Sequence, residues 1–296
     1  MSNPVDEYLI KLKTALQGCD QATVQDALAD AEDHLRTALS KAKEIQPGPD
    51  EAGSLDAIIE EYGSPEEVAA AYREIERRLP PTLAPAPQSA DRSLWLRIFG
   101  VVVEPRAWGA LLYMLISLLT GILYFTWAIT GLSLSVSLII LIIGLPFLFL
   151  FLLSVRGIAL VEGRIVEALL GVRMPRRSIF VDKNKGFWAR LKELVSSWLV
   201  WKTLLYMLLM LPLGIIYFTI FVTLISLGLG MVALPFVQLF IHLPLITINS
   251  VRYFVPFWQM PFWAAAGALV LLASMHFAKL VGWVQGSFAK LMLMGG

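Results

Sequence analysis

Long apolar runs dominate the second two-thirds of the chain, and one of them organises the pattern. The stretch Trp108–Thr130 contains no charged residue. A helix rises about 1.5 Å per residue, so about 20 apolar residues cross a bilayer. This stretch is long enough to do so, and we predict a membrane crossing over 107–130.

A second apolar stretch, Trp201–Thr223, repeats the first. When residues 94–134 are aligned without a gap on 187–227, 18 of 41 positions are identical. Apolar composition alone can match leucine with leucine, but it does not explain shared tryptophan, arginine, glycine and tyrosine positions. These are Trp95 with Trp188, Arg97 with Arg190, Gly121 with Gly214, and Tyr124-Phe125-Thr126 with Tyr217-Phe218-Thr219. We therefore predict an internal duplication of a membrane unit.

Three further crossings are expected, at 134–155, 202–226 and 262–280. A rival count makes 227–248 a fifth crossing. Shorter amphipathic segments suit the membrane surface, at 94–103, 154–171 and 187–198. Glu162 falls on the apolar side of the second of these segments, and we expect it to pair with a basic residue nearby.

The second copy departs from the first after Pro235. Residues 246–256 alternate between polar and apolar positions, as a β structure does. We predict a small β-like outer loop within 238–261. Its candidate sensing residues are Asn249, Arg252, Tyr253 and Trp258.

The first 78 residues have helical periodicity instead. Apolar positions recur at helical spacing, and they predict four helices, at 4–17, 21–43, 54–62 and 65–78. Gly63 suits a left-handed helix end. Ser64 with Glu67 forms a capping-box pattern that begins the last helix.

Composition and charge divide the chain in the same way. Hydrophobic residues make up 57% and charged residues 16%, whereas soluble domains have about 25% charged residues. Residues 1–92 carry 9 basic and 18 acidic side chains, and the rest carries 15 and 5. Nine basic residues fall within 156–192, which the positive-inside rule places in the cytoplasm with both termini. Five of them are candidate contacts for anionic lipid: Arg173, Arg176, Arg177, Lys183 and Lys185.

The fold class that follows is an all-α integral membrane protein. We predict a helical domain at 4–78 and a Pro/Ala linker at 79–92. The first membrane repeat is 93–171, a basic linker is 172–186, and the second repeat is 187–296. Each repeat enters and leaves on the same face, so we expect parallel repeats related by an axis along the membrane normal.

The sequence contains no catalytic motif that we recognise. It lacks HExxH, a nucleophile elbow, a P-loop and GxGxxG. The single cysteine, Cys19, forms no intramolecular disulfide, and no histidine has a second ligand at metal spacing. We therefore expect a protein that is not an enzyme and has no cofactor or metal. Tyr124, Thr126, Tyr217 and Thr219 occupy equivalent places, where they either pack the repeat interface or line a cleft for a lipid or small molecule.

Two family resemblances add to this reading. Asp30-Ala31-Glu32-Asp33-His34-Leu35 and Glu60-Glu61-Tyr62-Gly63-Ser64-Pro65-Glu66-Glu67-Val68-Ala69 resemble the HAAS-type helical domain of bacterial membrane proteins. Gly121-x-x-Tyr124-Phe125, Gly144-Leu145-Pro146 and the run from Arg156 to Gly171 resemble the "putative sensor" membrane domain. The first resemblance implies a cytoplasmic signalling domain. The second implies a sensor of the bacterial inner membrane, and that family often precedes a histidine kinase.

We therefore expect a non-catalytic sensor that relays a membrane or envelope stimulus to an unidentified cytoplasmic protein. Membrane lipids and a second copy of the chain are further expected partners, and nucleic acid is not. A membrane scaffold is the first alternative. A lipid or small-molecule transporter working between the repeats is the second.

Overall fold

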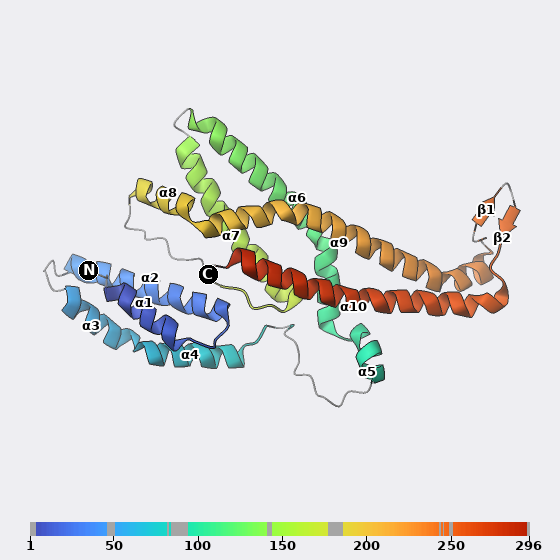
Figure 1. The fold of residues 1–296 in the computed structure, drawn as a ribbon, viewed down its shortest axis with the longest axis horizontal. Helices are drawn as coiled ribbons and strands as arrows, with labels where there is room; N and C mark the ends of the chain where they lie inside the picture. The colour runs from blue at the N-terminus through green and yellow to red at the C-terminus, as the bar shows by residue number, and fades with distance from the viewer. Residues whose placement is uncertain are drawn as a thin grey trace.

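The computed structural model describes residues 4–45, 51–81, 83, 94–140, 144–176, 186–242, 244, 246–248 and 251–294. Four short helices at the N-terminus form one domain, and four long helices with shorter elements form the rest (Figure 1). Each part has its own buried apolar cluster.

The N-terminal domain contains α1 (Pro4–Ala15), α2 (Gln21–Ile45), α3 (Glu51–Tyr62) and α4 (Pro65–Arg78). The predicted apolar faces meet, and Val5, Leu12 and Leu16 of the first segment pack with Ala31 and Leu35 of α2. Burial of these side chains is the main force that holds four short helices together.

The junction between α3 and α4 confirms the capping prediction. Gly63 has a φ of 110°, in the left-handed region that glycine adopts most readily. The Ser64 side chain accepts a hydrogen bond from the Glu67 backbone N–H, and the Glu67 carboxylate accepts one from the Ser64 backbone N–H. The two bonds fix the start of α4.

The membrane region begins with α5 (Leu94–Phe99) and a short 3-10 helix at Gly100–Val102. Its longer helices are α6 (Pro105–Ile139), α7 (Gly144–Leu170), α9 (Trp198–Phe236) and α10 (Met260–Leu293), with α8 (Phe187–Ser196) before α9. A π-helical turn at Val237–Ile241 continues α9, and a 3-10 turn at Phe257–Gln259 precedes α10. Between them β1 (Ile246–Ile248) pairs antiparallel with β2 (Val251–Tyr253). Among the described residues, four helices are long and apolar enough to cross a membrane.

Two expectations about the crossings were wrong. We expected a crossing that ended near 155 and a separate surface helix at 154–171, but α7 is one continuous helix from Gly144 to Leu170. Pro146 lies in the first turn of α7, where proline is tolerated. Polar residues begin midway along α7 and suggested that the crossing ends there. The helix continues because this part of α7 is packed against protein.

Helices α6 and α9 cross closely, and two glycines make the crossing possible. A Cβ atom at Gly121 would come within 3.0 Å of the Met210 carbonyl oxygen, and one at Gly214 would come equally close to the Ser117 oxygen. Small residues let two helix backbones approach in this way. The α6–α7 and α9–α10 pairs diverge from this crossing (Figure 1).

The same contacts recur at positions related by the sequence repeat. The Trp108 indole N–H donates to the Val102 carbonyl, and the Trp201 indole N–H donates to the Val195 carbonyl. Each indole therefore anchors the start of a long helix to the short helix that precedes it.

Candidate functional site

A carboxylate lies at the centre of the membrane region. Glu162 of α7 is 1% exposed, and three tyrosine hydroxyls donate to it. Tyr113 and Tyr206 each donate to Oε1 over 2.7 Å, and Tyr124 donates to Oε2 over 2.8 Å. A buried ionisable group is expensive in a membrane unless it is paired, so these hydroxyls stabilise Glu162.

A buried glutamine of α10 completes the cluster. Gln285 donates from Nε2 to the hydroxyls of Tyr113 and Tyr206, over 3.3 Å in each case. Its Oε1 accepts a hydrogen bond of 3.0 Å from Tyr217. The cluster of Glu162, Gln285, Tyr113, Tyr124, Tyr206 and Tyr217, which we call the tyrosine cluster, joins α6, α7, α9 and α10.

The tyrosine cluster links four helices through hydrogen bonds. Its donors and acceptors satisfy one another, and no group of residues suited to a metal ion occurs in the described part of the chain. Networks of buried hydrogen bonds specify one arrangement of the helices that carry them. A change in the angle between α6 and α9 would therefore break bonds to α7.

The end of α7 holds the chain that follows it. Arg164, which points away from the tyrosine cluster, donates to the carbonyl oxygens of Met174 over 3.1 Å and Pro175 over 2.5 Å. Arg164 also pairs with Glu167. Gly171 has a φ of 68° and lets the chain turn back along α7, as a helix C-cap glycine does.

This returning segment, residues 171–176, is where the N-terminal domain docks. The Arg176 backbone N–H donates to the Asp26 carboxylate over 2.6 Å. The Arg173 guanidinium donates to Thr23 Oγ1 and to the Glu76 carbonyl. From the other side, Lys290 near the end of α10 forms an ion pair of 2.6 Å with Asp20.

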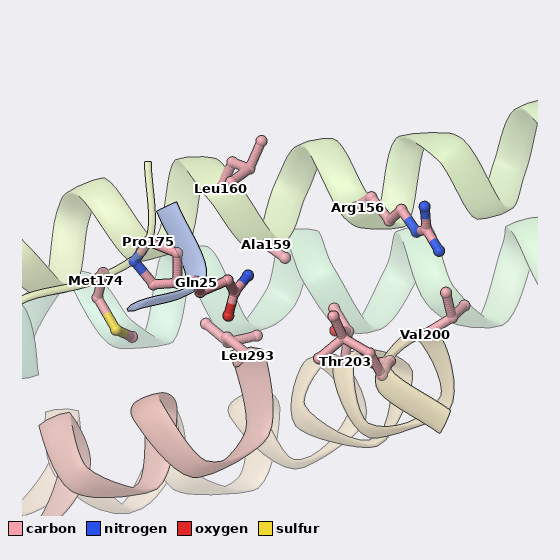
Figure 2. Close-up of a pocket in the computed structure, with 11 residues that line it drawn as sticks. Gln25, Arg156, Ala159, Leu160, Met174, Pro175, Val200, Thr203 and Leu293 are labelled. Atoms are coloured by element: carbon pink, nitrogen blue, oxygen red, sulfur yellow. The ribbon is translucent and has the colours of Figure 1, made fainter. Parts of the chain in front are cut away.

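A small cavity lies between the docked domain and the membrane helices. Its volume is about 40 Å³, and it is lined by Gln25 of α2, residues of α7, Met174 and Pro175, the first turns of α9, and Leu293. Figure 2 shows the Arg156 guanidinium of α7 on the side of Val200 of α9. The cavity thus touches α2, α7, the segment 171–176, α9 and the end of α10.

The predicted cleft residues do not share one surface. Tyr124 and Tyr217 belong to the tyrosine cluster, but Thr126 and Thr219 are exposed on the outside of α6 and α9. The expectation that Glu162 pairs with a basic residue was wrong, because its partners are tyrosines.

The predicted outer residues are described only in part. Trp258 is 68% exposed next to α10, and Arg252 and Tyr253 belong to β2. Asn249 lies outside the described residues. Of the candidate lipid contacts, Arg173 and Arg176 contact the N-terminal domain, while Arg177, Lys183 and Lys185 lie outside the described residues.

One signal for the tyrosine cluster was present in the sequence. Tyr113 and Tyr206 are an identical pair in the gapless alignment, as are Tyr124 and Tyr217. Glu162 also stands out in the sequence, because it is a charged residue on the apolar side of a predicted helix. Sequence reasoning did not join these observations, because it assigned Glu162 to a surface helix outside the membrane bundle.

Comparison with known families agrees with both resemblances. The model of a family described as "Putative sensor" matches residues 113–293, and that of a family described as "HAAS" matches residues 7–71. No match was found among curated proteins, and none among solved structures. The first match includes every member of the tyrosine cluster.

Proposed function

Because the chain belongs to the "Putative sensor" family, we propose that it is a non-catalytic membrane sensor whose N-terminal domain reports the state of the membrane helices. The stimulus acts on the bilayer-exposed helices or on the outer loop. The output is a change in how the HAAS domain docks, which a cytoplasmic regulatory protein reads. Neither enzymatic chemistry nor a cofactor is part of this proposal.

One observation carries the proposal: a single helix links the tyrosine cluster to the docking surface. Glu162 and Arg164 are two residues apart on α7, so they move together. Glu162 is held by α6 and α9, while Arg164 holds the segment that binds α2. A shift of α7 relative to α9 therefore alters the position of residues 171–176.

The docking surface has the character of a reversible contact. Its polar contacts are ion pairs and hydrogen bonds, including Asp20–Lys290 with both side chains more than a quarter exposed, and they surround the buried Ala22 and Thr23 of α2. Such pairs contribute about 0–1 kcal/mol each, so a modest displacement is sufficient to release them. An interface designed to switch needs this low stability.

The proposed topology puts the docking surface and both termini in the cytoplasm of a bacterial inner membrane. Nine basic residues in 156–192 support this orientation. We also propose that α6–α7 and α9–α10 are two parallel repeats. The paired indole contacts, the reciprocal glycine contacts and the shared tyrosines support that relationship.

A scaffold that recruits a partner without responding to a stimulus is the main alternative. It predicts a stoichiometric complex whose composition does not change under envelope stress, whereas a sensor releases or gains its partner. A transporter working between the repeats is less well supported, because the backbones of α6 and α9 touch at Gly121 and Gly214.

The test measures docking by amide hydrogen exchange on the full chain in lipid nanodiscs. We expect Glu162→Gln to increase exchange at residues 21–26 and 171–176, because a side-chain amide cannot accept all three tyrosine hydroxyls as the carboxylate does. Lys290→Glu should do the same by a direct route, and Asp20→Lys added to it should restore protection. Glu66→Gln, at an exposed carboxylate of α4, is the control.

The comparison of these variants decides between a rigid scaffold and a relay, by which we mean coupling of the tyrosine cluster to the docking of the N-terminal domain. If Lys290→Glu loosens α2 but Glu162→Gln leaves residues 21–26 and 171–176 unchanged, the tyrosine cluster is not coupled to docking and the relay is wrong.

A further inference from the structure

The cavity is lined by Arg156, and two of the three nitrogens of its guanidinium have no hydrogen-bond partner in the described part of the chain. Its Nε and Nη1 atoms are buried and unbonded in the described part of the chain. Almost every buried polar group in a folded protein has a partner, and an exception calls for an explanation such as an ion. The carboxylate of Glu193 on α8 is near enough to act electrostatically but bonds to neither nitrogen.

The other half of the membrane region shows what such a cation binds. Lys279 of α10 forms an ion pair of 2.6 Å with Glu104, the residue that precedes α6. Lys279 stands six positions before Gln285-Gly286, as Arg156 stands six positions before Glu162-Gly163. Arg156 and Lys279 are therefore corresponding cations.

The corresponding carboxylate is missing on the Arg156 side. The gapless alignment that pairs Tyr113 with Tyr206 also pairs Glu104 with Ser197. Both residues are the N-cap of the long helix that follows, and their backbone dihedral angles are nearly the same. Glu104 has φ −78° and ψ 116°, and Ser197 has φ −72° and ψ 111°. A serine hydroxyl is neutral, so Ser197 does not supply the negative charge that Glu104 supplies.

We propose that the cavity beside Arg156 binds a phosphate group, which takes the place that the Glu104 carboxylate has beside Lys279. A guanidinium binds phosphate oxygens through two parallel hydrogen bonds, and Nε with a terminal nitrogen provides that geometry once the Arg156 side chain turns this buried edge toward the cavity. The cavity of about 40 Å³ is larger than the ~10–15 Å³ that one water needs.

The phosphate comes either from an anionic lipid or from solution. The first turns of α9 line the cavity, and Trp198 and Trp201 on the same turns are exposed. Exposed tryptophans are typical of the membrane interface, where lipid phosphates lie. Ala159, Leu160 and Val200 form an apolar wall that suits the glycerol and acyl part of a lipid.

A phosphate bound in this cavity would also lie next to the surface on which the N-terminal domain docks. Gln25 of α2 and Met174 and Pro175 of the docking segment line the same cavity. This consequence rests on the function proposed above, whereas the phosphate site itself does not.

The experiment uses the purified full chain in a maltoside detergent, which contains no phosphate. Thermal unfolding is followed during separate titrations with phosphatidylglycerol and with inorganic phosphate. At a hundredfold excess over the dissociation constant we expect the midpoint to rise by about 5 °C. A rise with lipid alone identifies a lipid site, and a rise with inorganic phosphate identifies a site for the free ion.

Two variants address the site from opposite sides. Arg156→Gln removes the cation and should abolish the shift. Ser197→Glu provides the missing carboxylate, so it should raise the midpoint without ligand and make the protein insensitive to phosphate. Arg106→Gln removes a cation that does not line the cavity and should respond as the wild type does.

The proposal is overturned if neither ligand shifts the wild-type midpoint, or if both variants keep the full wild-type shift. Hydrogen exchange at residues 21–26 is measured in parallel. A midpoint shift without a change in exchange supports the phosphate site and counts only against the relay.

Discussion

Tyr113 and Tyr206, 93 residues apart in the chain, donate hydrogen bonds to the same oxygen of Glu162, each over 2.7 Å. One comes from α6 and the other from α9, so a single atom of α7 joins the two helices that cross at Gly121 and Gly214. Their hydroxyl oxygens are 3.3 Å apart, and each also accepts from Gln285. These hydrogen bonds form only when α6, α7, α9 and α10 have the relative positions seen in the structure.

Replacing Glu162 by glutamine tests the energy of this arrangement. The amide keeps one oxygen but turns the other acceptor into a donor, so at least one buried hydroxyl loses the acceptor for its own O–H. An unsatisfied buried hydroxyl destabilises a protein by about 1–3 kcal/mol, and we expect a loss of stability in that range. Chemical or thermal unfolding in detergent measures it, with Glu66→Gln as the control expected to stay within ~0.5 kcal/mol of wild type.

The glycine crossing makes a second prediction. Gly121→Ala places a methyl group against the Met210 backbone, which cannot move aside as a side chain can, and overpacking of this kind destabilises by about 1–3 kcal/mol. Gly157→Ala is the matched control, because a Cβ there would meet nothing within 4 Å. Equal unfolding midpoints for the two variants would contradict the close crossing.

The N-terminal domain should lose stability in alkaline solution because of Tyr8. Its hydroxyl donates to the Gly63 carbonyl over 2.8 Å. Burial raises the pKa of Tyr8 to about 12, and the nearby Tyr62, Glu66 and Glu67 act in the same direction. The unfolded chain ionises first, near pH ~10, so the contribution of Tyr8 is intact below that pH and is lost as the pH rises toward 12.

A difference titration measures this directly. Tyrosinate absorbance of the wild type minus that of Tyr8→Phe should show one group with a midpoint near pH 12. A midpoint near ~10, the value of a free tyrosine, would mean that the hydroxyl is accessible to water.

The proposed orientation is tested by thiol labelling in intact cells. A cysteine at Asn249 should react with a membrane-impermeant maleimide, whereas Cys19 of the N-terminal domain should react only after lysis. Labelling of Cys19 in intact cells with no labelling at position 249 would reverse the topology, and the positive-inside reading of 156–192 would be wrong.

The local fold was readable from the sequence because its signals are local. Ser64 and Glu67 are three residues apart, and the apolar positions of α1 and α2 recur every turn, so capping and burial follow from spacing. The tyrosine cluster was not readable because its members meet across four helices. Glu162 appeared misplaced only because no pattern within α7 shows that three hydroxyls from other helices reach it.

The docking of the N-terminal domain on residues 171–176 could not be predicted from the sequence, for a related reason. Basic residues at 173 and 176 are compatible with lipid, with topology or with a protein partner, and their charge is the same in each case. The partner is an acidic domain in the same chain. Only the turn at Gly171 brings the two together, and the sequence identifies that turn without showing where it leads.

The contact of Gly121 with Gly214's helix also has a mechanical meaning. Two helices that pack at a close crossing can tilt about it. When the distance between their ends on one side of the membrane increases, the distance between their ends on the other side increases too. In the orientation proposed above, bilayer thickness or lateral pressure acts on the outer ends of α6 and α9, and Val102 and Val195 precede their cytoplasmic ends. In the function proposed above, a change in lipid composition alone is enough to alter the angle at this crossing.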